Sequence, residues 1–234
     1  MITTILLDLD NTLIGNDMND FLPPYFAGLA SYLGNRLGDK SLPHMLSQGV
    51  QLITNNTSSA DNYTLFMDNF AEQIGYPVTE LQPLLIQFYA ETFPTLQQYT
   101  SFRPSAHPLI EQLLADGYKV VIATNPVFPQ TAIEQRLEWA GIADFPYPLV
   151  TTMENSFSCK PQLVYYEAIL ETVNSQPHEC WMVGDNLSHD IEPAHTLGCK
   201  TWWIPNGRAE ENSPSYDQHG ELVDLLRFVQ AKKL

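Results

Sequence analysis

Two carboxylates stand two residues apart directly after an apolar run near the start of the chain. Asp8 and Asp10 follow the run Ile5-Leu6-Leu7. Such a run predicts a buried strand, and side chains at i and i+2 of a regular strand point the same way. Two neighbouring carboxylates repel each other unless a metal or a shared proton compensates their charge. The pair therefore suggests a bound cation, and a cation beside a carboxylate suggests phosphate chemistry. The same residues also fit a plain strand followed by an Asp-Asn turn.

Polar residues of a complementary kind follow two later apolar runs. Thr124 and Asn125 come after the run 118–123, and Asp185 comes after the run 181–184. Open α/β sheets bind their ligands at the carboxyl ends of parallel strands. We therefore expect these side chains to lie close to the first carboxylate pair.

A lysine and a further carboxylate complete the set. Lys160 precedes Pro161 at the start of a helical stretch, and Asp190 stands five residues after Asp185. In chain order the segments supply a nucleophile, a hydroxyl donor, a fixed cation and a metal-binding carboxylate: Asp8, Thr124, Lys160 and Asp185.

In this order, the segments resemble the four motifs of the haloacid dehalogenase superfamily, most of whose members are phosphatases. Asp8-Leu-Asp10-Asn-Thr12 is similar to the first motif, DxDxT, and Thr124-Asn125 to the second. Lys160 before Pro161 is similar to the third, and Gly184 to Asp190 is similar to the fourth, GDxxxxD. Each motif is weak alone, but all four in order are specific. The resemblance covers about residues 1–14 and 100–205.

The resemblance implies a Mg²⁺-dependent phosphatase that works through an aspartyl-phosphate. Asp8 would be the nucleophile, and Asp10 would act as general acid and then as general base. Lys160 would neutralise charge on the nucleophile and the phosphoryl group. The substrate's phosphoryl oxygens would be held by Thr124, the amide of Asn125, and Lys160. The metal would be held by Asp8, Asp185 and the backbone carbonyl of Asp10, with Thr12 and Asp190 in support.

Other interpretations stay open at this point. Asp10 could bond only to turn amides, Thr124 could cap a strand end, and Lys160 could be a solvated helix-start residue. Asp190 could ligate metal through water, orient Lys160 or cap a helix. Asp10 favours phosphoester chemistry, because relatives that cleave carbon–halogen bonds lack an acid there.

Three other functional classes compete with the phosphatase. A mutase or phosphotransferase of the same family keeps the same residues. A non-catalytic scaffold predicts a broken motif, and none of the required positions is broken. A nucleotide-binding module would need a glycine-rich phosphate loop, and neither GxGxxG nor GxxxxGK[ST] occurs.

Alternating strands and helices must position these residues. They predict an α/β fold with a doubly wound, mostly parallel, Rossmann-like sheet. The expected strands are 2–8, 118–124, 147–151, 179–183 and 200–204, and the expected helices of this part are 104–117, 131–140, 161–174, 190–197 and 222–229. The segment 205–216 reads as a loop.

The stretch between the first two strands predicts helices only. These are 25–37, with Pro23-Pro24 in the first turn, then 42–53 with Ser41 as N-cap, 60–74, and 79–96 with a capping box at Thr79. Their apolar spacing indicates packing rather than a ligand site. We therefore expect a core domain of residues 1–14 and 100–234 and a helical cap domain of residues 15–99. Arg103, just after the cap, is a candidate contact for a phosphate or substrate group, or a plain surface arginine.

Composition limits the partners. The 234 residues carry a formal charge of −16, so a nucleic acid is an unsuitable partner. No signal segment and no apolar run of about 18 residues occurs, which predicts a cytoplasmic protein without a membrane partner. Three cysteines without a CxxC pattern fit a reducing compartment. The expected partner is a small phosphorylated metabolite, whose identity the sequence does not specify, and the oligomeric state stays open.

Overall fold

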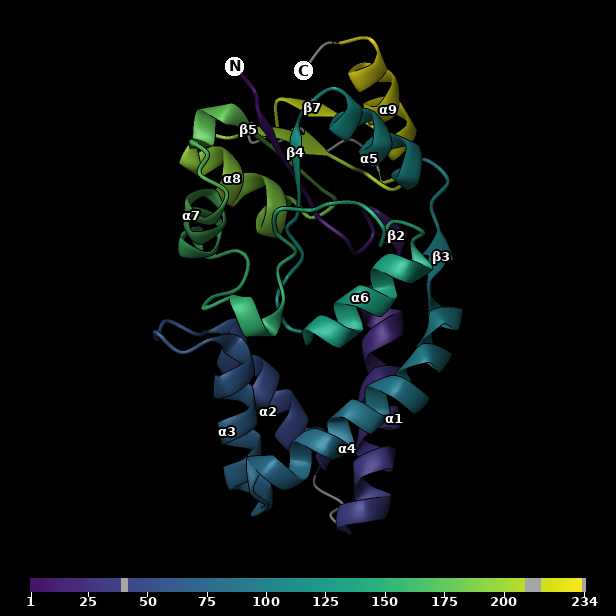
Figure 1. Ribbon diagram of the computed structural model, residues 1–234, viewed down its shortest axis with the longest axis vertical. Helices are drawn as coiled ribbons and strands as arrows, with labels where there is room; N and C mark the ends of the chain where they lie inside the picture. The colour runs from purple at the N-terminus through teal and green to yellow at the C-terminus, as the bar shows by residue number, and fades with distance from the viewer. Residues whose placement is uncertain (39–41, 209–215, 233–234) are drawn as a thin grey trace.

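The computed structural model describes residues 1–38, 42–208 and 216–232 of the chain. Within this part a five-stranded sheet has the order β4-β1-β5-β6-β7, and all neighbouring strands run parallel (Figure 1). Leu7 pairs with Ile122 and with Val183, so the residues that follow these three strands lie side by side. The strands are β1 (Thr4–Leu7), β4 (Lys119–Ile122), β5 (Cys180–Gly184), β6 (Lys200–Trp203) and β7 (Gln218–His219).

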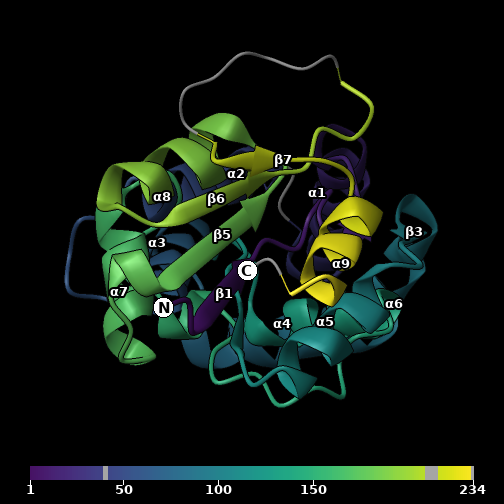
Figure 2. The same ribbon diagram turned by 90° about the horizontal axis from the view of Figure 1, so that it is seen from above.

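Alternate residues of β1 face opposite layers of helices, as the pleat of a strand requires. Leu6 packs with α7 and α8, whereas Ile5 and Leu7 pack with the layer that contains α5 and α9. Figure 2 shows the two layers on opposite sides of the sheet. The doubly wound sheet is confirmed. Its helices are α5 (Ala106–Ala115), α6 (Gln130–Trp139), α7 (Leu163–Thr172), α8 (Glu192–Leu197) and α9 (Leu222–Gln230).

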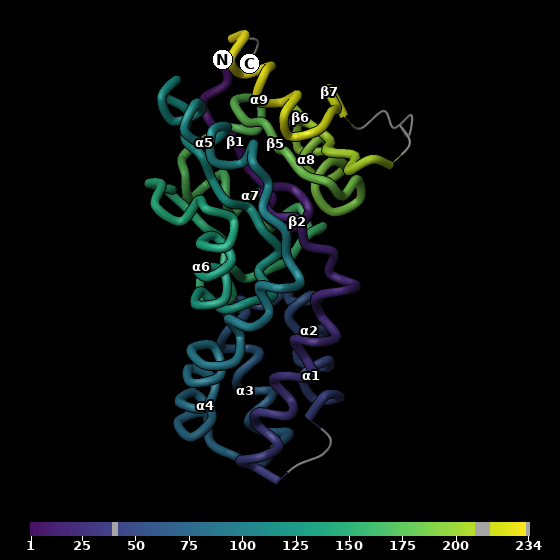
Figure 3. Tube along the Cα trace, turned by 90° about the vertical axis from the view of Figure 1, so that its right-hand side faces the viewer, coloured from purple at the N-terminus to yellow at the C-terminus, as the bar shows by residue number. Residues whose placement is uncertain are grey.

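An all-helical insert lies at the end of the molecule away from the two termini (Figures 1 and 3). The chain enters and leaves it through a short antiparallel ribbon, in which Ile14 pairs with Phe102 and Gly15 with Ser101. The predicted division into two domains falls beside this ribbon and stays a prediction. The ribbon consists of β2 (Ile14–Gly15) and β3 (Ser101–Phe102). The insert consists of α1 (Met18–Leu37), α2 (Leu42–Thr54), α3 (Asn62–Ile74), α4 (Val78–Glu91) and the 3₁₀ helix η1 (Phe93–Tyr99).

Several predicted boundaries were wrong. Helix α1 begins at Met18, because the carboxylate of Asp17 accepts a hydrogen bond from the backbone N–H of Asn19 and caps it, so both prolines lie inside the helix. Helix α4 follows Pro77, and its N-cap makes no side-chain hydrogen bond, so the capping box at Thr79 is absent there. The predicted helix to residue 96 instead ends at Glu91 and gives way to η1.

The expected strand 147–151 is reduced to one bridge between Ile122 and Val150. Two hydrogen bonds form this bridge: the N–H of Ile122 donates to the carbonyl of Leu149 at 3.1 Å, and the N–H of Thr151 donates to the carbonyl of Ile122 at 3.0 Å. The predicted N-cap Ser41 and residues 209–215 of the predicted loop lie outside the described residues.

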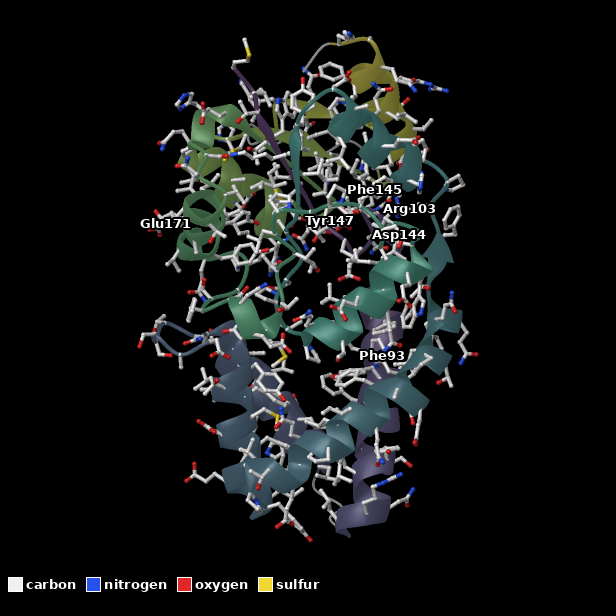
Figure 4. The ribbon with its side chains drawn as sticks, in the orientation of Figure 1. Phe93, Arg103, Asp144, Phe145, Tyr147 and Glu171 are labelled. Carbon is white, nitrogen blue, oxygen red and sulfur yellow. The ribbon has the colours of Figure 1, made fainter. Side chains whose placement is uncertain are left out.

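The helical insert is tied to the sheet domain by aromatic packing and by a buried amide. The ring of Phe93, labelled in Figure 4, stacks on Trp139 of α6 with centroids 5.3 Å apart. The side-chain amide of Asn62, at the start of α3, donates to the carbonyls of Pro126 and Ser158, at 3.2 and 3.4 Å. Because Asn62 is fully buried, these bonds fix α3 against the loop that precedes Lys160.

Candidate active site

The chain turns sharply as soon as β1 ends. The backbone N–H groups of Leu13 and Ile14 both donate to the carbonyl of Leu9, at 2.9 and 3.0 Å. Asn11 takes a left-handed conformation with φ 55°, which Asn tolerates better than most residues. The strand therefore does not continue regularly through Asp8 and Asp10. Both carboxylates nevertheless line one cleft of about 380 Å³, which we call the polar cleft. Asn125, Lys160, Asp185 and Asp190 also line this cleft.

Lys160 lies between two carboxylates in the polar cleft. Its Nζ is 2.7 Å from Oδ1 of Asp8 and 2.6 Å from Oδ1 of Asp190, and all three side chains are buried. Burial alone would lower the pKa of Lys160, but the attraction of the two carboxylates outweighs it and raises the pKa well above its usual value. The lysine is therefore a permanent cation beside Asp8.

Three carboxylates gather around this lysine. Asp8, Asp185 and Asp190 each offer an oxygen atom, and these atoms lie within 4.8 Å of one another. Burial, with added repulsion from Asp8, raises the pKa of Asp185 to about 6. Burial likewise raises the pKa of Asp190. A set of carboxylate oxygens that repel one another suits Mg²⁺, which prefers oxygen ligands. The residues therefore fit a magnesium ion.

Asp185, which follows β5, is held by a residue of β6 and by a residue of the segment after β6. Arg208 donates to its carbonyl and to Oδ2, at 2.6 and 3.0 Å. The indole N–H of Trp203 also donates to this carbonyl, at 3.0 Å. Sequence reasoning missed Arg208, which stands in the predicted loop and reaches the site only through the fold.

Asp190 belongs to the cleft rather than to a helix cap. It lies in the π-helical turn η4 (Leu187–Ile191), whose N-cap is Asn186. Oδ2 of Asp190 accepts a hydrogen bond from the backbone N–H of Asn186, while Oδ1 contacts Lys160. A side chain at Gly184 would overlap this carboxylate, so the glycine of the fourth motif makes room for it. The contact with Lys160 is the one expected if Asp190 orients the lysine.

Thr124 and Asn125 follow β4 after Ala123, and of the two it is Asn125 that lines the polar cleft with Asp8. The Oγ1 atom of Thr124 is buried and has no hydrogen-bond partner among the described residues, as is also true of Oγ1 of Thr12. An unpaired buried hydroxyl costs about 1–3 kcal/mol, and the hydroxyl of Thr124 keeps a donor that none of the described residues uses. Oδ1 of Asn125 accepts a hydrogen bond of 3.2 Å from the backbone N–H of Lys160. This bond links the second motif to the third.

A buried arginine that sequence reasoning missed lies against Asp10. Arg136 of α6 forms an ion pair with Oδ1 of Asp10, which also accepts from the amide of Asn16 at 2.7 Å. The guanidinium is fully buried, with its carbon 4.9 Å from the ring centroid of Phe128 and 5.4 Å from that of Phe21. Burial lowers the pKa of Arg136 to about 9, which still leaves it charged at neutral pH.

A sequence signal for Arg136 did exist. Ile133, Leu137 and Ala140 are all buried, and Arg136 stands between them at helical spacing. A lone cation on the apolar face of a helix must find a partner inside the protein, and here the partner is Asp10.

Arg103 supports the turn that carries Asp10. Its guanidinium donates to Oδ1 of Asn206 at 2.7 Å, and the amide of Asn206 donates to the carbonyl of Asn11 at 2.8 Å. Burial lowers the pKa of Arg103. Arg103 does not line the polar cleft, whose rim on that side carries Arg208.

A sequence model of haloacid dehalogenase-like hydrolases matches residues 2–198. The chain belongs to this family. Family membership makes the chain a hydrolase and confirms the resemblance drawn from the four motifs.

Curated relatives span nearly the whole chain. The pyrophosphatase PpaX of Bacillus mycoides is 26% identical over 97% of this chain and 98% of its own length. A ribulose-1,5-bisphosphate 5-phosphatase of Halopiger xanaduensis is 28% identical over 97% of this chain and 100% of its own. The relatives of this haloacid dehalogenase-like hydrolase therefore include phosphatases of different named substrates.

Solved structures share the fold. A 2-haloacid dehalogenase from Pseudomonas syringae superposes with a TM-score of 0.67 and 21% identity, over 100% of both chains. A phosphatase of the family from Thermococcus onnurineus superposes with a TM-score of 0.63 and 19% identity, over 97% of this chain and 98% of its own length. In the part of the chain that the structure describes, no helix has the length and apolar character needed to cross a membrane.

Proposed function

We propose that this chain is a Mg²⁺-dependent phosphatase that hydrolyses a small phosphomonoester through an aspartyl-phosphate on Asp8. One observation carries the proposal: Nζ of Lys160 lies 2.7 Å from Asp8 and 2.6 Å from Asp190, in a cleft shared with Asp10 and Asp185. This combination holds a nucleophile, a fixed cation, a metal-binding set and a separate acid within one site.

The first half-reaction transfers the phosphoryl group to the enzyme. An oxygen of Asp8 forms a bond to phosphorus while the bond from phosphorus to the alcohol oxygen breaks. Asp10 gives its proton to that oxygen, and the alcohol leaves. Lys160 and the hydroxyl of Thr124 stabilise the negative charge on the phosphoryl oxygens.

The second half-reaction hydrolyses the aspartyl-phosphate. Asp10, now ionised, accepts a proton from a water molecule as the water oxygen attacks phosphorus. The bond from phosphorus to the Asp8 oxygen breaks, and inorganic phosphate leaves. In both halves Arg136 and Asn16 hold the carboxylate of Asp10 in position, since both contact its Oδ1.

A magnesium ion fits beside these residues. Asp8, Asp185 and the backbone carbonyl of Asp10 would hold it, and it would neutralise charge on the phosphoryl group. The family member YfnB of Bacillus subtilis, with a TM-score of 0.55 and 18% identity, has been solved bound to magnesium, which supports this choice of ion. We assign Asp190 to the orientation of Lys160, because its Oδ1 contacts the lysine.

Phosphate release from a panel of phosphomonoesters tests the proposal. The intact chain is assayed with Mg²⁺, with EDTA, and with EDTA followed by excess Mg²⁺. We expect turnover that EDTA abolishes and Mg²⁺ restores, and that Asp8→Asn abolishes. Asp68→Asn, which makes the same chemical change at an exposed position of α3, is the matched control and should keep activity. Phosphate release by Asp8→Asn at the wild-type rate would contradict the proposal, and transfer to an added alcohol without phosphate release would identify a phosphotransferase.

A further inference from the structure

Two further cavities follow the polar cleft toward the helical insert, and each shares lining residues with the next. The first, of about 200 Å³, shares Asp10, Met18 and Asn125 with the cleft. We call it the inner cavity. The second, of about 250 Å³, lies among the helices of the insert, and we call it the cap cavity. The two cavities share four lining residues: Tyr25, Phe26, Val50 and Val127.

The walls of both cavities are predominantly apolar. The residues that the structure describes on these walls include no lysine, arginine or histidine. The hydroxyls of Tyr25 and Tyr89 are buried and bond to each other at 2.8 Å. This bond uses one donor and one acceptor of the two hydroxyls within the wall. Glu154, the carboxylate on the wall of the cap cavity, adds negative charge there.

We propose that the two cavities bind the leaving group of the substrate, and that this group is an apolar alcohol. The proposal rests on the phosphatase function proposed above. The inner cavity begins at Asp10, the residue that would protonate the leaving oxygen, so the carbon atoms attached to that oxygen must extend from this point. The path into the insert from there is bordered by Val50, Val127 and the two aromatic residues.

The charge distribution disfavours a second phosphate or a sugar in this position. A phosphate moved into these cavities would lose its water and meet no cation on the described walls, and Glu154 would repel it. A sugar would meet few polar side chains there, such as Gln82 and Thr131 in the cap cavity and Thr54 in the inner cavity, so most of its hydroxyls would lose hydrogen bonds to water. An alkyl or aryl group gains free energy from the same burial. The combined space is also in the usual range for a small-molecule site.

A series of n-alkyl phosphates from methyl to hexyl tests the proposal on the intact, Mg²⁺-loaded chain. We expect kcat/KM to rise about threefold to fourfold with each added methylene until the cavities are filled. A sugar phosphate and a bisphosphate serve as polar comparisons and should fall well below hexyl phosphate. Equal kcat/KM along the series, or a preference for the polar esters, would overturn the proposal.

Substitution at a position shared by the two cavities adds a second readout. Val50→Trp fills space common to both cavities, so the ratio of kcat/KM for hexyl phosphate to that for methyl phosphate should fall at least about tenfold. Leu52→Trp, on the exposed side of the same helix, is the control and should keep the wild-type ratio. An unchanged ratio in folded Val50→Trp counts against the proposal.

Binding separates this proposal from the phosphatase function. Calorimetry with n-alkylphosphonates, which resist hydrolysis, measures affinity without turnover. Affinity that rises with chain length in a chain that hydrolyses no ester would support the apolar cavities and contradict the phosphatase. Turnover with affinities that do not depend on chain length would support the phosphatase and overturn the apolar leaving group.

Discussion

The polar cleft and the cap cavity both share lining residues with the inner cavity, and they differ in charge. The polar cleft contains buried ion pairs, and the described wall of the cap cavity contains no cation. In the cleft, Lys160 is buried between Asp8 and Asp190, and Arg136 is buried against Asp10. Each buried charge there has a partner of opposite sign, as a low-dielectric site requires. On the described walls of the cap cavity no cation occurs, and the hydroxyls of Tyr25 and Tyr89 are bonded to each other.

This difference divides the work between two regions of the chain. The cleft is built by residues that follow strands of the buried parallel sheet. The cap cavity is built by amphipathic helices whose apolar faces do not fill the space between them. Under the two proposals, chemistry on the phosphoryl group takes place in the cleft and selection of the leaving group in the cavities, and Asp10 lines both the cleft and the inner cavity.

The largest expected effect comes from removing the acid at that junction. Asp10→Asn should lower kcat on alkyl phosphates by about 10²–10⁴-fold, because an alkoxide leaves poorly without a proton. On p-nitrophenyl phosphate the loss should be much smaller in the first half-reaction, because nitrophenolate leaves without one. The measurement is the burst of nitrophenolate and the steady-state rate for both substrates. If the rate of the nitrophenolate burst and kcat on alkyl phosphates fell by the same factor, Asp10 would not be the general acid.

Arg136 should give the next largest effect, through its hold on Asp10. Arg136→Met should lower kcat on alkyl phosphates by up to about 10²-fold, because the carboxylate of Asp10 loses a contact that fixes it. The loss should depend on the leaving group in the same sense as for Asp10→Asn, and the double variant should be little worse than Asp10→Asn alone. Arg136→Lys keeps the charge and should recover part of the rate. Strictly additive losses in the double variant would show that Arg136 acts independently of Asp10.

A cation introduced on the wall of the cap cavity would remove the difference in charge between the two regions. Val50→Lys should raise the ratio of kcat/KM for a bisphosphate to kcat/KM for hexyl phosphate by about tenfold. The reason is that the free-energy cost of burying the lysine falls when a phosphate pairs with it. Ratios measured in the same buffer at low and high salt would check the electrostatic cause, because salt should weaken the gain. Leu52→Lys on the exposed side of α2 provides the control.

The smallest effect concerns the tie between the two regions. Asn62→Ala leaves the carbonyls of Pro126 and Ser158 without their partner, which should lower the free energy of unfolding by about 1–3 kcal/mol. Denaturant unfolding measures this change, and Asn55→Ala, at an exposed position, is the control. A loss no greater than that of the control would mean that the buried amide does not hold α3 against the loop before Lys160.

Local patterns were sufficient to predict the strands β1, β4, β5 and β6 and the residues that follow them, but not the two-residue edge strand β7. Asp8, Thr124 and Asp185 each follow an apolar run, so the carboxyl edge of a parallel sheet was expected to gather them, and the polar cleft brings Asp8 and Asp185 together. The two-residue strands β2 and β3 escaped prediction because they are too short to show an alternating pattern.

Contacts made through tertiary packing could not be predicted in the same way. Arg208 reaches Asp185 from a loop 23 residues further along the chain. Tyr25, Val50 and Val127 come from three separate segments, and the apolar spacing of the helices was interpreted as packing alone. A buried side chain and the wall of a cavity give the same sequence pattern, because both are apolar at helical spacing.

The measurement that tests the central claim most directly is the search for a phosphoryl group on Asp8. Rapid acid quenching of the chain during turnover of its best ester, followed by peptide mass spectrometry, would detect it. We predict one added phosphoryl group, located on Asp8, labile to hydroxylamine and absent when turnover is stopped by EDTA. Turnover that proceeds without any phosphoryl group on the chain, or with one on a different residue, would contradict the account.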